Sequence, residues 1–361
     1  MERVYNFAAG PAVMPLEVLE NIKRNITNYE GEGLSIMEMS HRSKMYEKVI
    51  NETRDNLKTL LNLSNDYEIL FLQGGASLQF AMVPLNLADK GDTTCYAVTG
   101  NFANKAFEEA SKWTNVIAIT NSKDVNYKFI PKIEKEKIDK KSKYIHITAN
   151  NTIFGTSYND LPDVGDIPLV ADVSSIILGK EYDFNKFSLA YAGAQKNLGP
   201  AGLTVVIIKK NLIRDDLRND IPTMLRYDIH SKNSSMYNTP PTFSIYVAGE
   251  TFKWAIKEGG VKEFEKRNIE KANLLYDLLD NSTFYKPFAD KSSRSIMNVT
   301  FNLSTSELEA KFVEEAKNEG MINLKGHRVL GGIRASIYNA MTIEGVKKLA
   351  NFMEKFERNN K

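Results

Sequence analysis

The chain has 361 residues, 42% of them hydrophobic and 25% charged, so it is long enough for one large domain and a smaller companion. The formal net charge of +2 argues against a broad nucleic-acid-binding surface. No apolar run approaches the roughly 20 residues needed to span a bilayer, and the N-terminus lacks the apolar stretch of a signal peptide. The single cysteine, Cys95, excludes an intrachain disulfide framework and fits a reducing compartment. We expect a cytoplasmic globular protein without nucleic-acid or membrane partners.

The first half of the chain predicts an α/β domain. Apolar residues recur at helical spacing in 14–26 and 45–63, after an arm punctuated by Pro and Gly. Short apolar runs bounded by turns then predict seven strands, at residues 67–72, 93–98, 115–120, 143–148, 168–173, 188–192 and 203–208. Most are apolar throughout, which is typical of buried, largely parallel strands. We therefore predict a mainly parallel seven-stranded sheet with helices on both faces.

The C-terminal third predicts a second, smaller domain. A helical pattern covers residues 243–281 and is interrupted at Gly259 and Gly260. A strand is predicted at 295–303 and further helices at 306–320 and 343–359. We predict three parts: an arm at 1–15, a large domain at 16–259 and a small α+β domain at 260–361.

A glycine-rich turn follows the first predicted strand. Gly74 and Gly75 precede a helix, so the free amides at its start and the hydroxyl of Ser77 are placed to hold a phosphate group. Ordinary turn chemistry is the commoner role of such a glycine pair, and the segment is neither a GxGxxG fingerprint nor a Walker loop.

An aspartate and an isolated lysine lie at two later strand ends. Asp172 alone is most simply a helix N-cap. Lys196 stands between Ala192–Ala194 and Gly199–Gly202, small residues that let a bulky flat group approach the backbone. With the phosphate-binding turn, these residues are what pyridoxal 5′-phosphate requires. The lysine forms a Schiff base with its aldehyde, and the carboxylate keeps its pyridine nitrogen protonated.

Two further residues are candidates for the same site. Phe102 follows the strand at 93–98 and can stack on the cofactor ring, although most such aromatic residues belong to the core. Thr152 is a candidate donor to the phenolic oxygen of the cofactor, with turn chemistry as the alternative. We assign no metal ligand.

Cationic residues predict an anionic substrate. His41 and Arg42 lie between two predicted helices, and His327 and Arg328 lie in a turn-rich segment that continues to Arg334. One His-Arg pair is usually a solvated loop. Two pairs in a chain with four histidines, with an arginine in an apolar run, favour a small acid that carries at least two anionic groups.

The chain resembles the phosphoserine aminotransferase family, a group of class V aminotransferases with fold type I of the PLP-dependent transferases. The resemblance runs nearly from end to end, through the motifs "GPAVMP", "MSHRS", "FLQGGASLQF", "NNTIFGT", "ADVSS", "AGAQKNLGPAG", "SMYNTPPTF" and "GHRVLGGIRASIYNAM". It implies amino-group transfer between L-glutamate and 3-phosphohydroxypyruvate, giving O-phospho-L-serine and 2-oxoglutarate in serine biosynthesis. It also permits 4-phosphohydroxy-L-threonine, of pyridoxine biosynthesis, as a second substrate.

The resemblance also implies a role for each motif residue. Lys196 is the Schiff-base lysine, Asp172 pairs with the pyridine nitrogen, Thr152 meets the phenolic oxygen and Phe102 stacks on the ring. The residues implied to hold the cofactor phosphate are Ala76, Ser77 and Gln195, with Asn238 and Thr239 from a second subunit. Arg334 is implied to bind the substrate α-carboxylate, and the residues implied around the phosphate or distal carboxylate are His41, Arg42, His327 and Arg328. A homodimer with its sites at the interface follows.

Two positions depart from the family pattern. Phe102 stands where tryptophan is common, and Asn151 where glutamate is common. The alternatives are an alanine–glyoxylate aminotransferase, a cysteine desulfurase, and a non-catalytic protein that binds a phosphate ligand. A desulfurase needs a nucleophilic cysteine on a mobile loop, whereas Cys95 is predicted in a strand as a small core residue.

Overall fold

A seven-stranded sheet forms the centre of the protein. The computed structural model describes residues 3–361, so the first two residues of the predicted arm lie outside the described residues. In spatial order the strands are β2 (Tyr67–Leu72), β10 (Thr204–Lys209), β9 (Leu189–Gly193), β8 (Leu169–Asp172), β5 (Ile145–Thr148), β3 (Thr93–Val98) and β4 (Asn115–Asn121). Only β10 runs against its neighbours, β2 and β9. The mainly parallel sheet confirms the predicted fold class.

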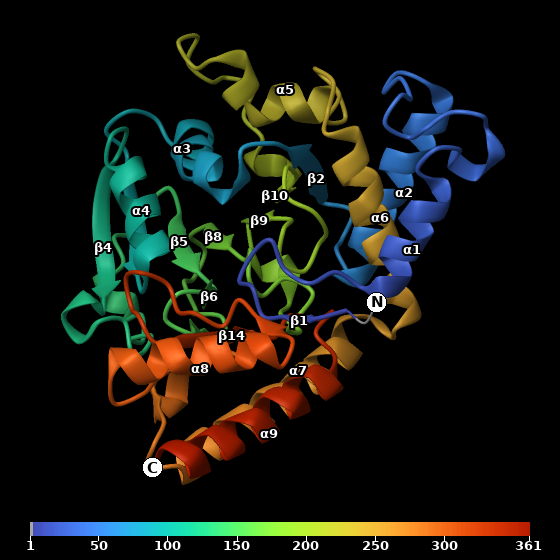
Figure 1. Cartoon of the computed structure of the whole chain (residues 1–361). Coiled ribbons are helices and arrows are strands. Elements are labelled where there is room, and N and C mark those ends of the chain that lie inside the picture. The colour runs from blue at the N-terminus through green and yellow to red at the C-terminus, as the bar shows by residue number, and fades with distance from the viewer. Residues whose placement is uncertain (1–2) are drawn as a thin grey trace.

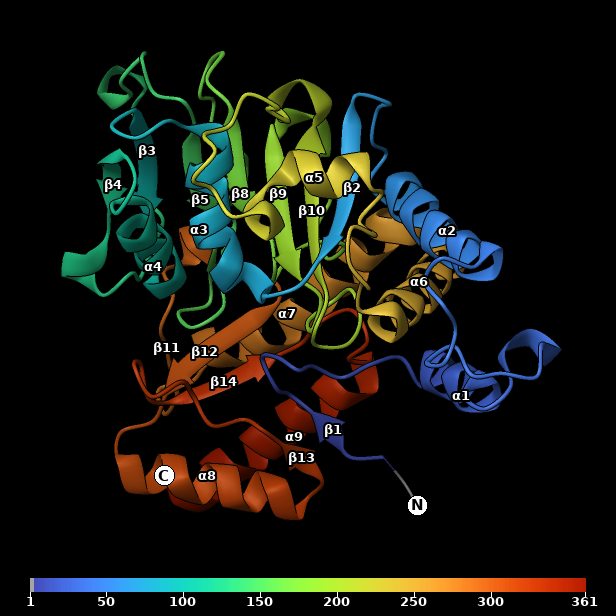
Figure 2. The same ribbon diagram turned by 90° about the horizontal axis from the view of Figure 1, so that it is seen from above.

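Helices cover both faces of this sheet because its strands are buried on both sides. Ile69 and Phe71 pack into one core with α2 (Lys44–Leu60) and α6 (Thr242–Lys257). Leu70 and Leu72 point the other way, into a core shared with α3 (Gly75–Leu87), α4 (Asn101–Ala110) and α5 (Tyr227–Lys232). Figure 2 shows these last three helices in front of the sheet. The edge strand β4 differs, since most of its side chains are exposed or half-buried.

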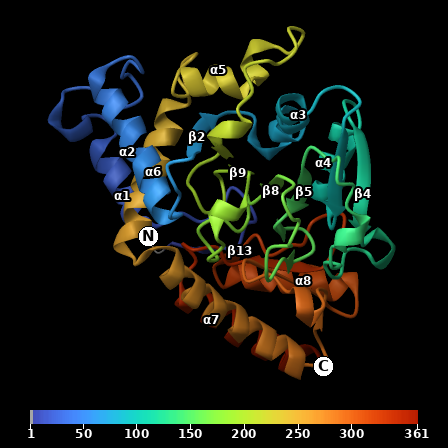
Figure 3. The same cartoon turned by 180° about the vertical axis from the view of Figure 1, so that it is seen from behind.

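The C-terminal residues form a second core. The helix α7 (Gly260–Asn281) begins at a break where Gly259 and Gly260 have φ of +100° and +73°, as predicted. A three-stranded antiparallel sheet of β11 (Lys286–Pro287), β12 (Asn298–Asn302) and β14 (Ile333–Ser336) packs with α7, α8 (Ser306–Asn318) and α9 (Ile343–Asn360). Figure 3 shows α7 and α8 on the side of the molecule away from α3 and α5. The domain boundary at residue 259 stays a proposal.

The N-terminal arm joins this second core to the lysine loop. The arm precedes α1 (Leu16–Asn25) in the chain (Figure 1). Its strand β1 (Tyr5–Asn6) pairs in parallel with β13 (Met321–Ile322). Phe7 is fully buried in the C-terminal core, and the amide of Ala12 donates to the carbonyl of Gln195 over 2.9 Å. The sequence patterns did not predict the β1–β13 pair. Within residues 3–361, no helix has both the length and the apolar character to cross a membrane.

Candidate active site

The predicted cofactor residues gather at one edge of the sheet. The carboxyl ends of the parallel strands share that edge, where loops of open α/β sheets bind ligands. The residues that follow or end β2, β3, β5, β8 and β9 are Gly74, Phe102, Thr152, Asp172 and Lys196, respectively. The five positions therefore lie at one edge of the sheet, and their assignment to one cofactor site stays a proposal.

Lys196 lies at the centre of this edge, half-buried. Its Nζ donates to Thr152 Oγ1 over 2.9 Å and lies 5.9 Å from the centre of the Phe102 ring. Burial lowers the pKa of Lys196 to about 8; nearby Asp172 opposes this shift and Arg334 adds to it. An amine with this pKa is in part uncharged near neutral pH, so it can act as a nucleophile or a base.

Asp172 is a buried carboxylate with one oxygen engaged. Its side chain is 6% exposed, and Oδ1 accepts a hydrogen bond of 2.9 Å from the amide of Ser174. Burial raises the pKa of Asp172, while Lys196 and the hydrogen bond from Ser174 oppose the rise. Hydrogen bonding from Ser174 holds the carboxylate in place, and its negative charge is available to a cationic ligand group. The capping role considered from the sequence and a binding role are thus compatible.

Thr152 belongs to a buried polar network. Its hydroxyl donates to Ser175 Oγ over 2.9 Å, and Ser175 in turn donates to the carbonyl of Asn150. The side-chain amide of Asn150 bonds to Asn298 on β12 over 2.8 Å, and Asn298 donates to Ser336 on β14 over 3.0 Å. This network links the lysine pocket to the strand that carries the substrate-binding arginine predicted from sequence.

Asn151, one of the two departures from the family pattern, is a buried structural residue. Its Nδ2 donates to Thr99 Oγ1 over 3.3 Å and to Thr156 Oγ1 over 3.1 Å, between the short strands β6 (Asn150–Asn151) and β7 (Thr156–Ser157). A Cβ on Gly100 would clash with Asn151 Oδ1, so this position favours glycine. Asn151 thus packs against the start of α4, the helix that carries Phe102.

The glycine turn prepares the start of α3 for an anion. Gly74 and Gly75 have φ of +85° and +65°, and a Cβ on Gly74 would meet the side chain of Leu78 at 2.6 Å. The first amides of a helix have no partner within it and lie at the positive end of its dipole. The amides of Ala76 and Ser77 are among these groups. Gln195, from the lysine loop, lies beside Gly10 of the arm.

Four basic residues lie near one another next to this pocket. Arg334, on β14, donates to the carbonyl of Thr152 over 3.5 Å. Burial lowers the pKa of His327, and the positive charges of Arg334, Arg328 and Lys105 lower it further. His327, Arg328 and Arg334 were predicted from the sequence as site residues, and Lys105 was not. Lys105 stands three residues after Phe102 on α4 and hence on the same helix face.

The other predicted residues do not reach this pocket within one chain. His41 and Arg42 lie between α1 and α2, on the opposite side of the molecule from α4 in Figures 1 and 2. Asn238 lines a small cavity with Gln73, and within residues 3–361 no hydrogen bond joins Asn238 to Ser77. Their roles, and that of Thr239, therefore remain proposals.

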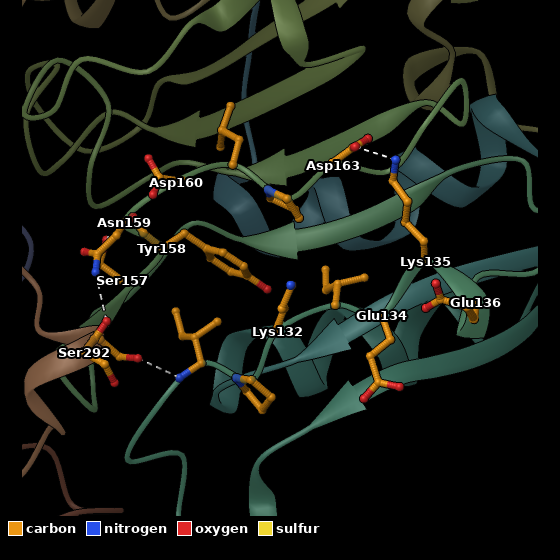
Figure 4. Close-up of a pocket in the computed structure, with 16 residues that line it drawn as sticks. Lys132, Glu134, Lys135, Glu136, Ser157, Tyr158, Asn159, Asp160, Asp163 and Ser292 are labelled. Carbon is orange, nitrogen blue, oxygen red and sulfur yellow. Dashed lines mark hydrogen bonds and ion pairs between the residues drawn. The ribbon is translucent and has the colours of Figure 1, made fainter.

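A large cavity lies elsewhere. It has a volume of about 700 Å³ and is lined by segments 130–136 and 157–163 with Ser292 and Ser293, and none of the predicted site residues borders it (Figure 4). An ion pair between Lys135 and Asp163 lies among its lining residues. Cavity volume therefore does not mark the chemistry in this protein.

Comparison with known proteins places the chain in a family. The sequence profile described as Aminotransferase class-V matches residues 4–349, and the chain belongs to the class V aminotransferases. It is 50% identical to the phosphoserine aminotransferase of Bacillus cereus over the full length of both chains. The match to the structure of phosphoserine aminotransferase from Bacillus circulans subsp. alkalophilus spans 100% of this chain and 100% of that one, with a TM-score of 0.97 and 46% identity. The PLP-bound phosphoserine aminotransferase of Trichomonas vaginalis covers 98% of this chain and 100% of its own, with a TM-score of 0.92 and 35% identity.

The balance of charges around Lys196 predicts its titration. Trace acetylation of the cofactor-free protein, quantified for each lysine by mass spectrometry, should give Lys196 a reactivity that rises with pH with a midpoint near 8. In Asp172→Asn the carboxylate that favours the ammonium is lost, so the midpoint should fall further. Labelling of the exposed Lys112 controls for unfolding. A midpoint near the ordinary lysine value of about 10.4, or an upward shift in the variant, would contradict the assignment.

Proposed function

We propose that this protein is a phosphoserine aminotransferase, which uses pyridoxal 5′-phosphate to transfer an amino group between L-glutamate and 3-phosphohydroxypyruvate. The observation that carries the proposal is the half-buried Lys196 between Thr152 and Asp172, beside a group of cations. The 50% identity over the full length to a protein named phosphoserine aminotransferase supports the same substrate class.

The residues present fit the cofactor. The start of α3, with Ala76 and Ser77, offers amides and a hydroxyl for its phosphate, and Phe102 offers an aromatic face for its ring. Asp172 has a buried carboxylate for the ring nitrogen, and Lys196 has an amine for the aldehyde. When bound, pyridoxal phosphate supplies a ring that withdraws electrons from the carbon of the attached amino acid.

The chain's own residues would bind the substrate and move its proton. Arg334 would hold the α-carboxylate through its guanidinium, which donates to the Thr152 carbonyl. The Nζ of Lys196, with a pKa of about 8, would take the α-proton as a base and return it as an acid. Asp172, the buried carboxylate near Lys196, would stabilise the positive charge on the ring nitrogen of the bound cofactor.

We also propose that the active protein is a homodimer whose sites lie at the interface. This accounts for the residues that one chain leaves outside the pocket, His41, Arg42, Asn238 and Thr239. Localisation in the cytoplasm and use of 4-phosphohydroxy-L-threonine as a second substrate are proposals of the same kind, supported by the family resemblance.

The structure disfavours a cysteine desulfurase. Cys95 lies within β3, fully buried, with its Sγ 3.0 Å from Ser142 Oγ. A nucleophilic cysteine needs exposure and a mobile loop, and this thiol has neither. Cys95 is the small core residue expected from the sequence. Likeness to an alanine–glyoxylate aminotransferase of Nostoc is limited to 15% identity and so extends to the fold alone.

Comparison of two amino acceptors tests the proposed substrate. With L-glutamate as donor, kcat/KM for 3-phosphohydroxypyruvate should exceed that for unphosphorylated 3-hydroxypyruvate by roughly 100-fold or more. Two charge-assisted contacts to the phosphate, at about 1.5 kcal/mol or more each, suffice for this factor. Equal use of the two acids would remove phosphate recognition from His327 and Arg328. An absorbance change on adding glutamate alone distinguishes an aminotransferase from a non-catalytic binding protein.

Subunit mixing tests the shared site. The variants Lys196→Ala and Arg42→Ala should each be nearly inactive alone. After unfolding and refolding together at equal amounts, half of the dimers are mixed, and one site in each has both residues intact, so roughly a quarter of wild-type activity should return. If Lys196 and Arg42 of one chain served the same site, every site would lack one of them. Mixing would then restore nothing, and the shared-site proposal would fail.

A further inference from the structure

Lys105 lies next to the pocket and takes no part in the proposed steps of the reaction. It stands one turn after Phe102 on α4, which starts at the carboxyl end of β3. The Nζ of Lys105 is 5.7 Å from the centre of the Phe102 ring, and the Nζ of Lys196 is 5.9 Å from the same point. The two distances add to 11.6 Å, which is the greatest separation that the two amines can have. Both amines therefore lie beside the same aromatic ring, which places Lys105 next to the pocket.

Three elements bring cations to this side of the pocket. Lys105 comes from α4, His327 and Arg328 from the loop before β14, and Arg334 from β14 itself. They are close enough for Lys105, Arg328 and Arg334 each to disfavour the protonated form of His327, after the effect of burial. Among residues 3–361, the His327 ring has one hydrogen-bond partner, the backbone amide of Val329, which donates to Nδ1 over 3.2 Å.

These cations have no counter-charge from the protein. Within residues 3–361, no carboxylate lies at ion-pair distance from Lys105, Arg328 or Arg334, whereas Lys112, seven residues further along the chain, pairs with Glu109. Like charges that are held together without a counter-charge repel one another, so the arrangement costs free energy until an anion binds. A phosphate dianion neutralises more of this charge than a carboxylate does.

We propose that Lys105 is a specificity-determining residue, which binds the phosphate group of the phosphorylated acceptor together with His327 and Arg328. The inference rests on the proposed function and extends it to a residue that the sequence motifs did not include. A phosphate ester attached two atoms beyond the reacting carbon extends roughly 5 Å from it. The flexible side chain of Lys105, anchored one turn beyond Phe102, covers the remaining distance to that group.

A simpler role for Lys105 is to cover the Phe102 ring through a cation–π contact. The two roles predict different results. A residue that only supports Phe102 affects both acceptors alike, because the ring lies beside Lys196 in either reaction. A residue that binds phosphate affects the phosphorylated acceptor alone. Its effect also appears in KM more than in kcat, because the contact is made to a group remote from the reacting carbon.

Acceptor selectivity in the holoenzyme separates these roles. In Lys105→Met, the ratio of kcat/KM for 3-phosphohydroxypyruvate to that for 3-hydroxypyruvate should fall roughly tenfold, mainly through KM. Lys105→Arg keeps the charge and should recover most of the ratio. Lys112→Met, on the exposed lysine near the end of the same helix, should leave it unchanged. An unaltered ratio in Lys105→Met, or an equal loss with both acceptors, would overturn the proposal.

A second readout does not depend on turnover. The chain has four histidines, so the ring signals can be resolved by NMR, with His327→Gln as the assignment control. Inorganic phosphate added to the holoenzyme should raise the pH midpoint of His327, because the anion stabilises the imidazolium. In Lys105→Met the midpoint without phosphate should already be higher, and roughly tenfold more phosphate should be needed for the same change. If neither keto acid is a substrate, the proposed function fails, yet this titration still decides whether Lys105 binds phosphate. A midpoint and phosphate response equal to wild type would overturn it.

Discussion

The arrangement of the site depends on one amine held at the carboxyl edge of a parallel sheet. Lys196 is withdrawn from water far enough to lower its pKa, yet it lies near a buried carboxylate and an arginine that act on it in opposite directions. The opposing effects of Asp172 and Arg334 leave the amine poised between its two protonation states near neutral pH. Each of the three residues comes from a different element, so the balance exists only in the folded chain.

A second buried lysine shows that a lowered pKa does not by itself make a catalytic amine. Burial lowers the pKa of Lys271, on α7, to about 7. Its Nζ donates to the carbonyls of Ile337, Tyr338 and Met341, each over 2.9 Å. All three protons of the ammonium are engaged by backbone carbonyls, so this lysine ties α7 to the segment after β14. Lys196, by contrast, bonds one side-chain hydroxyl and faces the pocket.

Much of the fold followed from the sequence, because its signals are local. The seven apolar runs became the seven strands with ends that differ by about two residues, and the Gly259-Gly260 break separates α6 from α7. Pairings between distant segments, such as β1 with β13, carry no local pattern and were missed. Lys196 and Asp172 were predicted as site residues from their place at strand ends. Lys105 was not predicted, because a lysine on a helix surface looks like a solubilising residue until its neighbours are known.

The N-terminal arm and the buried amides give the pocket a rigid frame. The arm contacts the lysine loop at Gln195, and the Asn150–Asn298 pair joins the Thr152 side of the pocket to the strand of Arg334. The groups that would hold the cofactor and the group that would hold the substrate carboxylate are therefore set by one connected network.

The lysine that carries the cofactor can be identified directly. The holoenzyme is reduced with borohydride and digested, and the cofactor is located by mass spectrometry. The reduced cofactor should be found on Lys196 and be absent from Lys105 and Lys271. Attachment to another lysine, or to none, would contradict it.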